Sequence, residues 1–306
     1  MFGLRYHVAS LAGVFLALAV GILLGVAISG KVAEAEDSLQ QERRQNLEED
    51  LEAANARAEA AEQSGEASRE LVERAYPALM ERLLDDLEFA LLFVGPVDGN
   101  VRSAVERALF DAGAGGPAFL IALDVPIEPD DLQSTIESTE LLAGFADDGG
   151  DFGDLGLGLG EEVVAGGDTP LWDTLQSELV QETSGSFASE VDGAVVMYSW
   201  TPTANEEGED DEATRQMDAT RSLAEGLVRG LDASGVPVVG VATTAGPTSL
   251  TDLYRGGGIS SVDDVDTTAG RLALALLLAG GDPGHYGVKE TATDGVAPPV
   301  ETLTGE

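Results

Sequence analysis

Cysteine is absent from this 306-residue chain, and basic residues are scarce. Without cysteine there is no disulfide, no thiolate metal site and no cysteine nucleophile. Only 16 Lys and Arg stand against 56 Asp and Glu, which gives a formal net charge of -40. Nucleic acid is not an expected partner, because phosphate binding needs clustered Lys and Arg. Self-repulsion of this size weakens a compact fold unless salt screens it, so we predict adaptation to high salt.

Motifs for catalysis are also missing from the sequence. There is no G-x-x-x-x-G-K-[ST] loop and no G-x-S-x-G nucleophile elbow, and the chain has only two histidines. The turn at residues 95–100 lacks the glycine spacing of a dinucleotide loop, and the glycines at 156–160 do not follow an apolar strand. We therefore expect neither an enzyme nor a cofactor.

One long segment, residues 8–28, has no charged side chain. A secretory signal needs about 7 to 15 apolar residues and a membrane-spanning helix about 20, so we predict a single N-terminal transmembrane helix within residues 1–30. Cleavage before Gly30 is the alternative, because small residues precede it. Arg5 before the segment predicts a single-pass membrane protein with a cytoplasmic N-terminus and an extracytoplasmic bulk, residues 31–306.

Small residues recur every four positions on one face of this segment. Small side chains at that spacing let two helices approach closely in lipid, although Gly and Ala are common in any membrane helix. We predict self-association, or packing on a partner helix, through this face. Its residues are Ala9, Gly13, Ala17, Gly21, Gly25 and Ser29.

A helical stalk is predicted for residues 31–80, which are rich in Glu, Ala, Gln and Arg and have no proline before Pro77. Apolar residues alternate at four- and three-residue steps, which is typical of a coiled-coil seam. The seam consists of Leu47, Leu51, Ala54, Ala58 and Ala61. A solvated single helix is the alternative, but the position next to the small-residue face favours a homo-oligomer formed by span and stalk.

Short apolar runs alternate with amphipathic segments over residues 88–290, and residues 291–306 form a C-terminal tail. Strands that are apolar throughout need cover on both faces, so we predict an α/β domain with a mainly parallel sheet and helices on each side. The predicted strands are residues 89–95, 118–125, 193–200, 236–244 and 259–262, and the predicted helices are residues 101–110, 131–143, 171–180, 214–231 and 268–279.

Two segments of this domain are interpreted as surface insertions. They are the glycine-rich stretch at residues 150–160 and the acidic stretch at residues 205–212. Residues 272–279 are too short for a second membrane span, so we predict a core helix there.

Polar residues follow several of the predicted strands. Ligands of open α/β sheets bind at the carboxyl ends of the strands, which predicts a crevice there. Ordinary turn and N-cap residues are the alternative, and Asp98 suits a cap of the helix at 101–110. The crevice candidates are Asp98, Asp124, Thr201, Thr243 and Thr244.

The two ends of the chain carry a family resemblance. Residues 4–25, LRYHVASLAGVFLALAVGILLG, and residues 284–299, GHYGVKETATDGVAPP, together with the polar helix and the α/β pattern, resemble the MctB family of mycobacterial-type copper transporters. The resemblance implies a membrane protein that limits cytoplasmic copper, described in mycobacteria as a pore-forming outer membrane protein. It makes His285, Tyr286 and Gly287 the family tail motif, with packing of an ordered strap as the alternative role.

Copper is the transported ion that the resemblance implies, but no ligand set for it is identified. Copper(I) prefers Cys and Met, and copper(II) takes imidazole, whereas the four methionines are scattered. The strands also lack the polar-apolar alternation of a transmembrane barrel. A second hypothesis is a non-enzymatic scaffold whose extracytoplasmic α/β head docks a cell-envelope protein, because actinobacterial relatives are connected with cell separation.

Overall fold

The computed structural model describes residues 3–145, 151–200 and 211–300, and their side chains except at residues 3–9, 26–42 and 211. The chain divides into two compact units, residues 1–69 and residues 70–306. The helices are α1 (Gly3–Met80), α2 (Gly99–Asp111), α3 (Pro129–Ser138), η1 (Glu140–Phe145), α4 (Gly153–Ala165), α5 (Pro170–Leu179), α6 (Asp211–Ala233), α7 (Ser249–Gly256) and α8 (Thr268–Leu278). The strands are β1 (Phe89–Val94), β2 (Phe119–Leu123), β3 (Val180–Gly185), β4 (Gly193–Tyr198), β5 (Val238–Val241), β6 (Ser260–Val262) and β7 (His285–Tyr286).

Helix α1 confirms the helical part of the stalk prediction. It runs for 78 residues with a single internal proline, Pro77, close to its end. Ala, Glu, Gln and Arg favour this conformation because they lose little side-chain freedom in a helix. Pairing of two such helices in a coiled coil stays a prediction.

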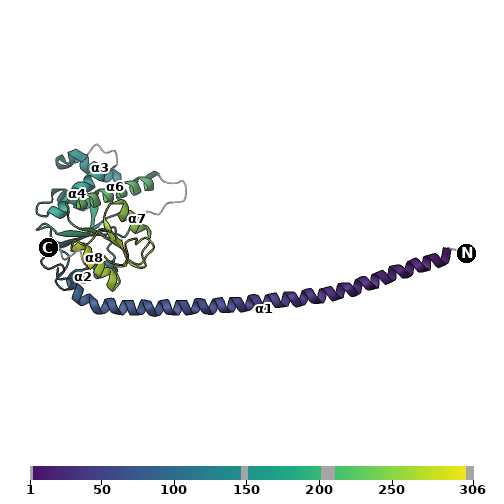
Figure 1. Ribbon diagram of the computed structural model, residues 1–306. Helices are drawn as coiled ribbons and strands as arrows, with labels where there is room; N and C mark the ends of the chain where they lie inside the picture. Colours follow the sequence, from purple (N-terminus) through teal and green to yellow (C-terminus); the bar gives the residue numbers. More distant parts are fainter. Residues whose placement is uncertain (1–2, 146–150, 201–210, 301–306) are drawn as a thin grey trace. The chain divides into compact units, whose positions relative to one another are not determined.

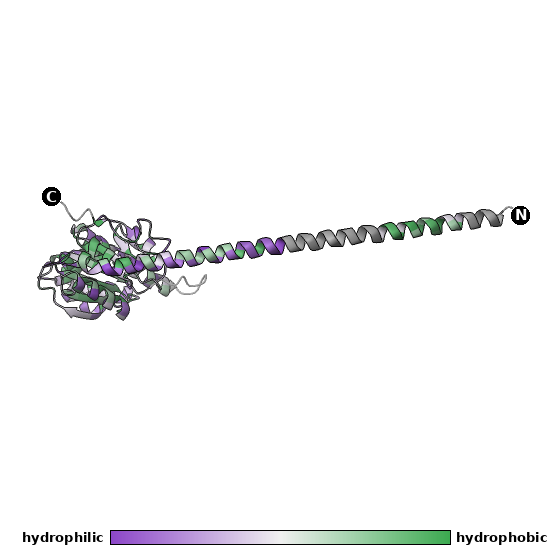
Figure 2. Ribbon diagram, turned by 60° about the horizontal axis from the view of Figure 1, so that its bottom comes forward, coloured by the Kyte–Doolittle hydropathy of each residue, from purple (hydrophilic) through white to green (hydrophobic). Residues whose placement is uncertain are grey.

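The prediction of a single N-terminal transmembrane helix is wrong as stated. Within the described ranges, no helix is long and apolar enough to cross a membrane. The prediction rested on the absence of charged side chains over residues 8–28 alone. Figure 2 shows this hydrophobic stretch of α1 and the mostly hydrophilic stretch that the helix carries nearer its C-terminal end.

The predicted α/β architecture of the second unit is confirmed. Seven strands form one sheet in the order β3-β2-β1-β4-β5-β6-β7. All neighbours pair in parallel except β2 and β3, which pair antiparallel at the edge. Strands β1 and β4 are buried at every position, as their uninterrupted apolar sequences require. Strand β3 is mostly exposed and was not predicted, because its polar sequence VQETSG has no apolar pattern.

Helices cover both faces of the sheet (Figure 1). On one face α3, α4, α5, α6 and α7 pack against alternate residues of β1, β2 and β4, including Leu92, Ile121 and Val196. On the other face α2, α8 and the end of α1 pack against the intervening residues, such as Leu91 and Val195. The predicted core helix at residues 272–279 is confirmed, because every residue of α8 from Leu272 to Leu278 is buried.

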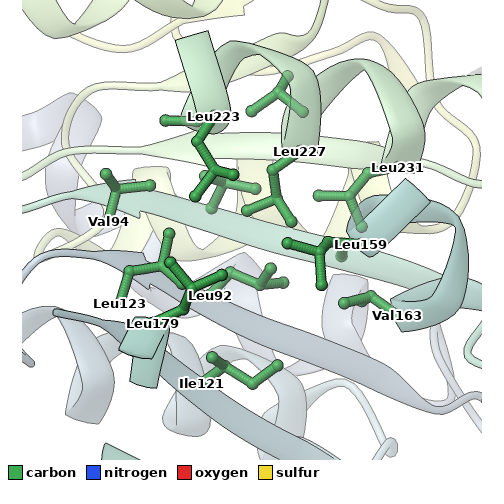
Figure 3. Packing of buried hydrophobic residues seen from close by; sticks show 14 of the residues in the cluster. Leu92, Val94, Ile121, Leu123, Leu159, Val163, Leu179, Leu223, Leu227 and Leu231 are labelled. Carbon is green, nitrogen blue, oxygen red and sulfur yellow. The ribbon is translucent and has the colours of Figure 1, made fainter. Parts of the chain in front are cut away.

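The interpretation of the glycine-rich stretch as a surface insertion is wrong. Residues 153–160 form the first part of α4, in which Leu155, Gly156, Leu159 and Gly160 are buried. A Cβ on Gly156 would lie 2.2 Å from the carbonyl oxygen of Leu223 in α6. The glycines therefore allow the α4 and α6 backbones to approach closely, and their leucines join one apolar cluster (Figure 3). Of the acidic stretch at residues 205–212, residues 205–210 lie outside the described residues, and Asp211 and Glu212 begin α6.

Candidate functional site

The loops after β5, β6 and β7 meet at the carboxyl edge of the sheet. These strands are parallel neighbours, so their carboxyl ends lie at the same edge. The loops contain Thr243 and Thr244 after β5, an acidic run from Asp263 to Asp266 after β6, and Gly287 to Lys289 after β7. The structure thus brings together two sets of predicted residues that are far apart in the sequence. One is the pair of crevice candidates after β5, Thr243 and Thr244, and the other is the family tail motif.

The Asp263 carboxylate fixes the tail motif to the end of β6. It is almost fully buried and accepts hydrogen bonds from the backbone N–H groups of Val288, at 2.9 Å, and Lys289, at 3.2 Å. Gly287 has a positive φ of 140°, and a Cβ there would lie 1.9 Å from Asp263 Oδ1. Only glycine fits this position, so Gly287 has a structural reason to be in the motif.

Lys289, the single lysine after the N-terminal region, connects the tail to the loop after β5. Its Nζ donates to the carbonyl oxygens of Thr243, at 2.7 Å, and Gly246, at 2.9 Å. The loop after β5 is also joined to the loop after β6, because Thr244 donates through its backbone N–H and its hydroxyl to the two carboxylate oxygens of Asp266, each at 2.7 Å. The three loops therefore form one hydrogen-bonded edge.

Asp264 is fully buried inside this edge. Burial raises its pKa from 3.8 to about 6, and the neighbouring Asp263 and Asp266 carboxylates add to the rise, while the Thr267 hydroxyl and Lys289 oppose it. Its Oδ2 accepts a hydrogen bond from Thr267 Oγ1 at 2.9 Å. Its Oδ1 has no hydrogen-bond partner among the described residues.

A pocket of about 450 Å³ opens beside these loops, between α2 and α8. Its lining combines hydroxyl, amide and guanidinium groups with two alanines that leave room. The lining residues are Asn100, Ser103, Ala104, Arg107, Thr243, Ala245, Asp266 and Arg271.

Arg271 is held against the end of α1 within the second unit. Its guanidinium lies over the Tyr76 ring, with 5.8 Å from Cζ to the ring centroid. The Tyr76 hydroxyl donates to Asp111 Oδ2 at 3.0 Å, and burial together with Asp111 raises the pKa of Tyr76 to about 12. Tyr76 therefore stays neutral, and Arg271 packs on an uncharged ring.

The remaining crevice candidates do not join this site in the same way. Asp98 caps α2 by accepting from the N–H groups of Asn100 and Val101, so its predicted cap role is confirmed. Asp124 is exposed, and its backbone N–H donates to Leu179. Thr201 lies outside the described residues. The functional role of all five candidates stays a prediction.

The two ring-bearing residues of the tail motif pack rather than converge on an ion. His285 Nδ1 lies 3.0 Å from Ser261 Oγ, and partial burial lowers the pKa of the imidazole. Tyr286 is buried and donates its hydroxyl to the Asp282 carbonyl. Over the described part of the chain, no group of three or more His, Cys, Asp or Glu is arranged to hold a metal ion. Met80 and Met197 are packed in the core.

Over its described side chains, the small-residue face of α1 makes no contact in this single chain. A Cβ on Gly13, Gly21 or Gly25 would meet no atom within 4 Å, and Ala17 is exposed. The side chains of Ala9 and Ser29 lie outside the described ones. Helix packing through this face stays a prediction.

Sequence reasoning missed Asn100, Ser103, Arg107, Asp266 and Arg271. One signal was available, because an acidic chain with few basic residues makes each arginine in a helix notable. The pattern could not show that arginines 164 positions apart line one pocket, which depends on α2 and α8 covering the same face of the sheet.

Fold and site together define the class, a mixed α/β protein with a polar pocket at the carboxyl edge of a mainly parallel sheet. The family model MctB, copper transport outer membrane protein, matches residues 1–297. The chain therefore belongs to the MctB family, which confirms the resemblance seen in the sequence and gives the chain a role in copper transport. No curated protein matches it.

Proposed function

We propose that this chain lowers cellular copper as a non-enzymatic, membrane-associated member of the MctB family. The observation that supports it is the family match over residues 1–297, which includes the N-terminal helix, the α/β unit and the tail motif together. The second unit then serves as a stable head, because its three edge loops are joined by Asp263, Asp266 and Lys289. Copper is the cargo of this proposed transport.

Deletion of the gene is expected to raise cellular copper and to arrest growth at lower external copper. The measurement is growth across a copper series with cellular copper quantified in the same cultures, and the full-length chain supplied in trans is the control that should restore both. Normal copper content in a strain whose cells fail to separate would contradict the copper proposal and favour a scaffold role.

A second function, a self-paired scaffold that docks a cell-envelope protein, is favoured by the polar part of α1. Leu47 and Leu51 on the predicted seam are 67% and 63% exposed in the single chain. Exposed leucines four residues apart on a polar helix are a surface that a second copy would cover. We therefore propose that α1 pairs with α1 of another copy along this seam.

Replacing Leu47 and Leu51 together by Gln is expected to weaken pairing at least about tenfold, because each leucine loses roughly 1.5 kcal/mol or more of apolar burial. Cross-linking of the full-length chain as a function of protein concentration measures this change. The control is Glu49→Gln with Ala56→Gln on the opposite helix face, which should leave the cross-linked fraction unchanged. Equal loss in both variants, or in neither, would contradict pairing along this seam.

A further inference from the structure

Two arginines line one pocket at the carboxyl edge, and neither forms an ion pair with a residue that the structure describes. Arg107 comes from α2 and Arg271 from α8, and both line the cavity of about 450 Å³. Six other arginines of the described chain do form ion pairs with nearby carboxylates, which are plentiful here. They are Arg74, Arg82, Arg102, Arg215, Arg221 and Arg255. The positive charge at this pocket is thus left available for a ligand.

Arg271 is oriented by neutral groups. Its Nη1 donates to the Asp266 carbonyl and its Nη2 to Thr268 Oγ1, each at 3.2 Å. The ring of Tyr76 lies under the guanidinium. Its Nε is buried and has no hydrogen-bond partner in the described ranges. None of these contacts neutralises the charge of the side chain.

Arg107 reaches the same pocket from an exposed position. Asn100, Ser103 and Arg107 lie three and four residues apart, so they share one face of α2. That face supplies an amide, a hydroxyl and a guanidinium to the cavity. Donors of this kind are the ones that bind phosphate-type oxygens.

Asp266 in the lining and Asp111 beside Tyr76 are already hydrogen-bonded to protein groups. Asp266 accepts from the Thr244 N–H and hydroxyl, and Asp111 accepts from the Tyr76 hydroxyl. These hydrogen bonds occupy acceptor oxygens that would otherwise compete for the arginines. Asp266 still adds one negative charge to the lining, which favours a ligand that also presents polar or apolar atoms beside its anionic group.

The net charge of -40 acts over a distance that salt makes short. At about 1 M salt the Debye length is about 3 Å, so a ligand in the pocket responds to the groups that touch it and not to the whole chain. Local guanidinium groups can therefore bind an anion on a strongly acidic protein.

We propose that this pocket binds a small molecule through a phosphate-type oxyanion, with Arg107 and Arg271 as its charged contacts. A cavity of about 450 Å³ has room for a phosphate with a small attached group. The site is distinct from copper transport and does not depend on the proposed function. A membrane surface is disfavoured, since it would contact surface carboxylates beyond the pocket as well as the two arginines.

The test measures by ³¹P NMR whether inorganic phosphate and glycerol 3-phosphate bind to the full-length chain in about 1 M KCl. Saturable binding of at least one of the two is expected, and Arg107→Gln should weaken it at least about tenfold. Arg107 is exposed, and its side chain makes no hydrogen bond or ion pair with a described residue, so this variant is expected to fold. Arg271→Lys is the second variant, and it is expected to weaken binding because lysine lacks the planar guanidinium fork.

The matched control is Arg229→Gln on α6, an exposed arginine on the other face of the sheet, which should bind like the wild type. Vesicles of phosphatidylglycerol test whether the pocket binds a lipid headgroup instead of a soluble phosphate. Absence of saturable binding to both soluble probes would overturn the proposal, and so would binding to vesicles only. Unchanged affinity in Arg107→Gln, or an equal loss in Arg229→Gln, would overturn the assignment of this pocket.

Discussion

Replacing Gly156 by Ala is expected to lower the free energy of unfolding of the α/β unit by about 3 kcal/mol. The new Cβ would lie 2.2 Å from the Leu223 carbonyl oxygen and 2.8 Å from the Leu227 backbone nitrogen. Both are backbone atoms of α6, so no side-chain rotation relieves the overlap and the two helices must separate. That separation would loosen the apolar cluster that Leu159 and Leu227 share (Figure 3).

The same close approach repeats along the two helices. A Cβ on Gly160 would lie 2.3 Å from the Leu227 oxygen, and one on Gly230 would lie 2.1 Å from the Leu157 oxygen. Gly230→Ala should therefore destabilise the unit to a similar extent. Denaturant unfolding in high salt measures both variants, with urea as the denaturant because it adds no charge.

The control for this prediction is Gly158→Ala in the same helix. A Cβ there would meet two side chains and no backbone atom, the end of the flexible Leu171 side chain at 2.9 Å and Phe145 Cζ at an ordinary 3.7 Å. Alanine also improves helix propensity over glycine by about 1 kcal/mol, so Gly158→Ala should be close to neutral or stabilising. If Gly156→Ala were as stable as Gly158→Ala, the close packing of α4 on α6 would be refuted.

Asp264→Asn is expected to stabilise the protein by about 2 kcal/mol at pH 7.5 and to remove part of its pH dependence. Burial raises the pKa of Asp264 from 3.8 to about 6, so the folded state binds this proton more tightly than the unfolded state does. Stability of the wild type therefore falls as the pH rises from about 4 to about 6, and the loss remains above that range. Asparagine stays neutral and still accepts from the Thr267 hydroxyl.

The measurement is the free energy of unfolding between pH 4 and pH 8 for both proteins, at a salt concentration that screens the other carboxylates. Asp282→Asn is the control, because it makes the same charge change at an exposed position. An equal change in slope for Asp264→Asn and Asp282→Asn would show that general repulsion, and not the burial of Asp264, sets the pH dependence.

The sequence was informative where one local pattern has one structural meaning. Uninterrupted apolar runs predicted β1 and β4 as buried central strands, because such strands need cover on both faces. Asp98 before an amphipathic segment predicted the cap of α2. The two end motifs predicted the MctB family, which the match over residues 1–297 confirms.

Patterns with two meanings were misread. Glycine favours turns in isolation, so residues 150–160 were interpreted as an insertion, whereas close packing on α6 makes the same glycines necessary inside α4. An apolar count over residues 8–28 predicted a transmembrane helix, and no helix over the described residues meets the length and hydropathy that a span requires. The polar strand β3 forms only because β2 offers it an edge.

The sequence by itself determined the charge, the lack of cysteine chemistry, the helical N-terminal part, the strand-helix alternation and the family. The tertiary structure decided which distant residues come together: Lys289 binds Thr243, Asp263 lies against Gly287, and Arg107 and Arg271 line one pocket. The physical reason is the distance along the chain over which each effect acts. Propensity and hydropathy act between residues close in the chain, whereas a site at the carboxyl edge is made by the order of strands in the sheet, which no local pattern encodes.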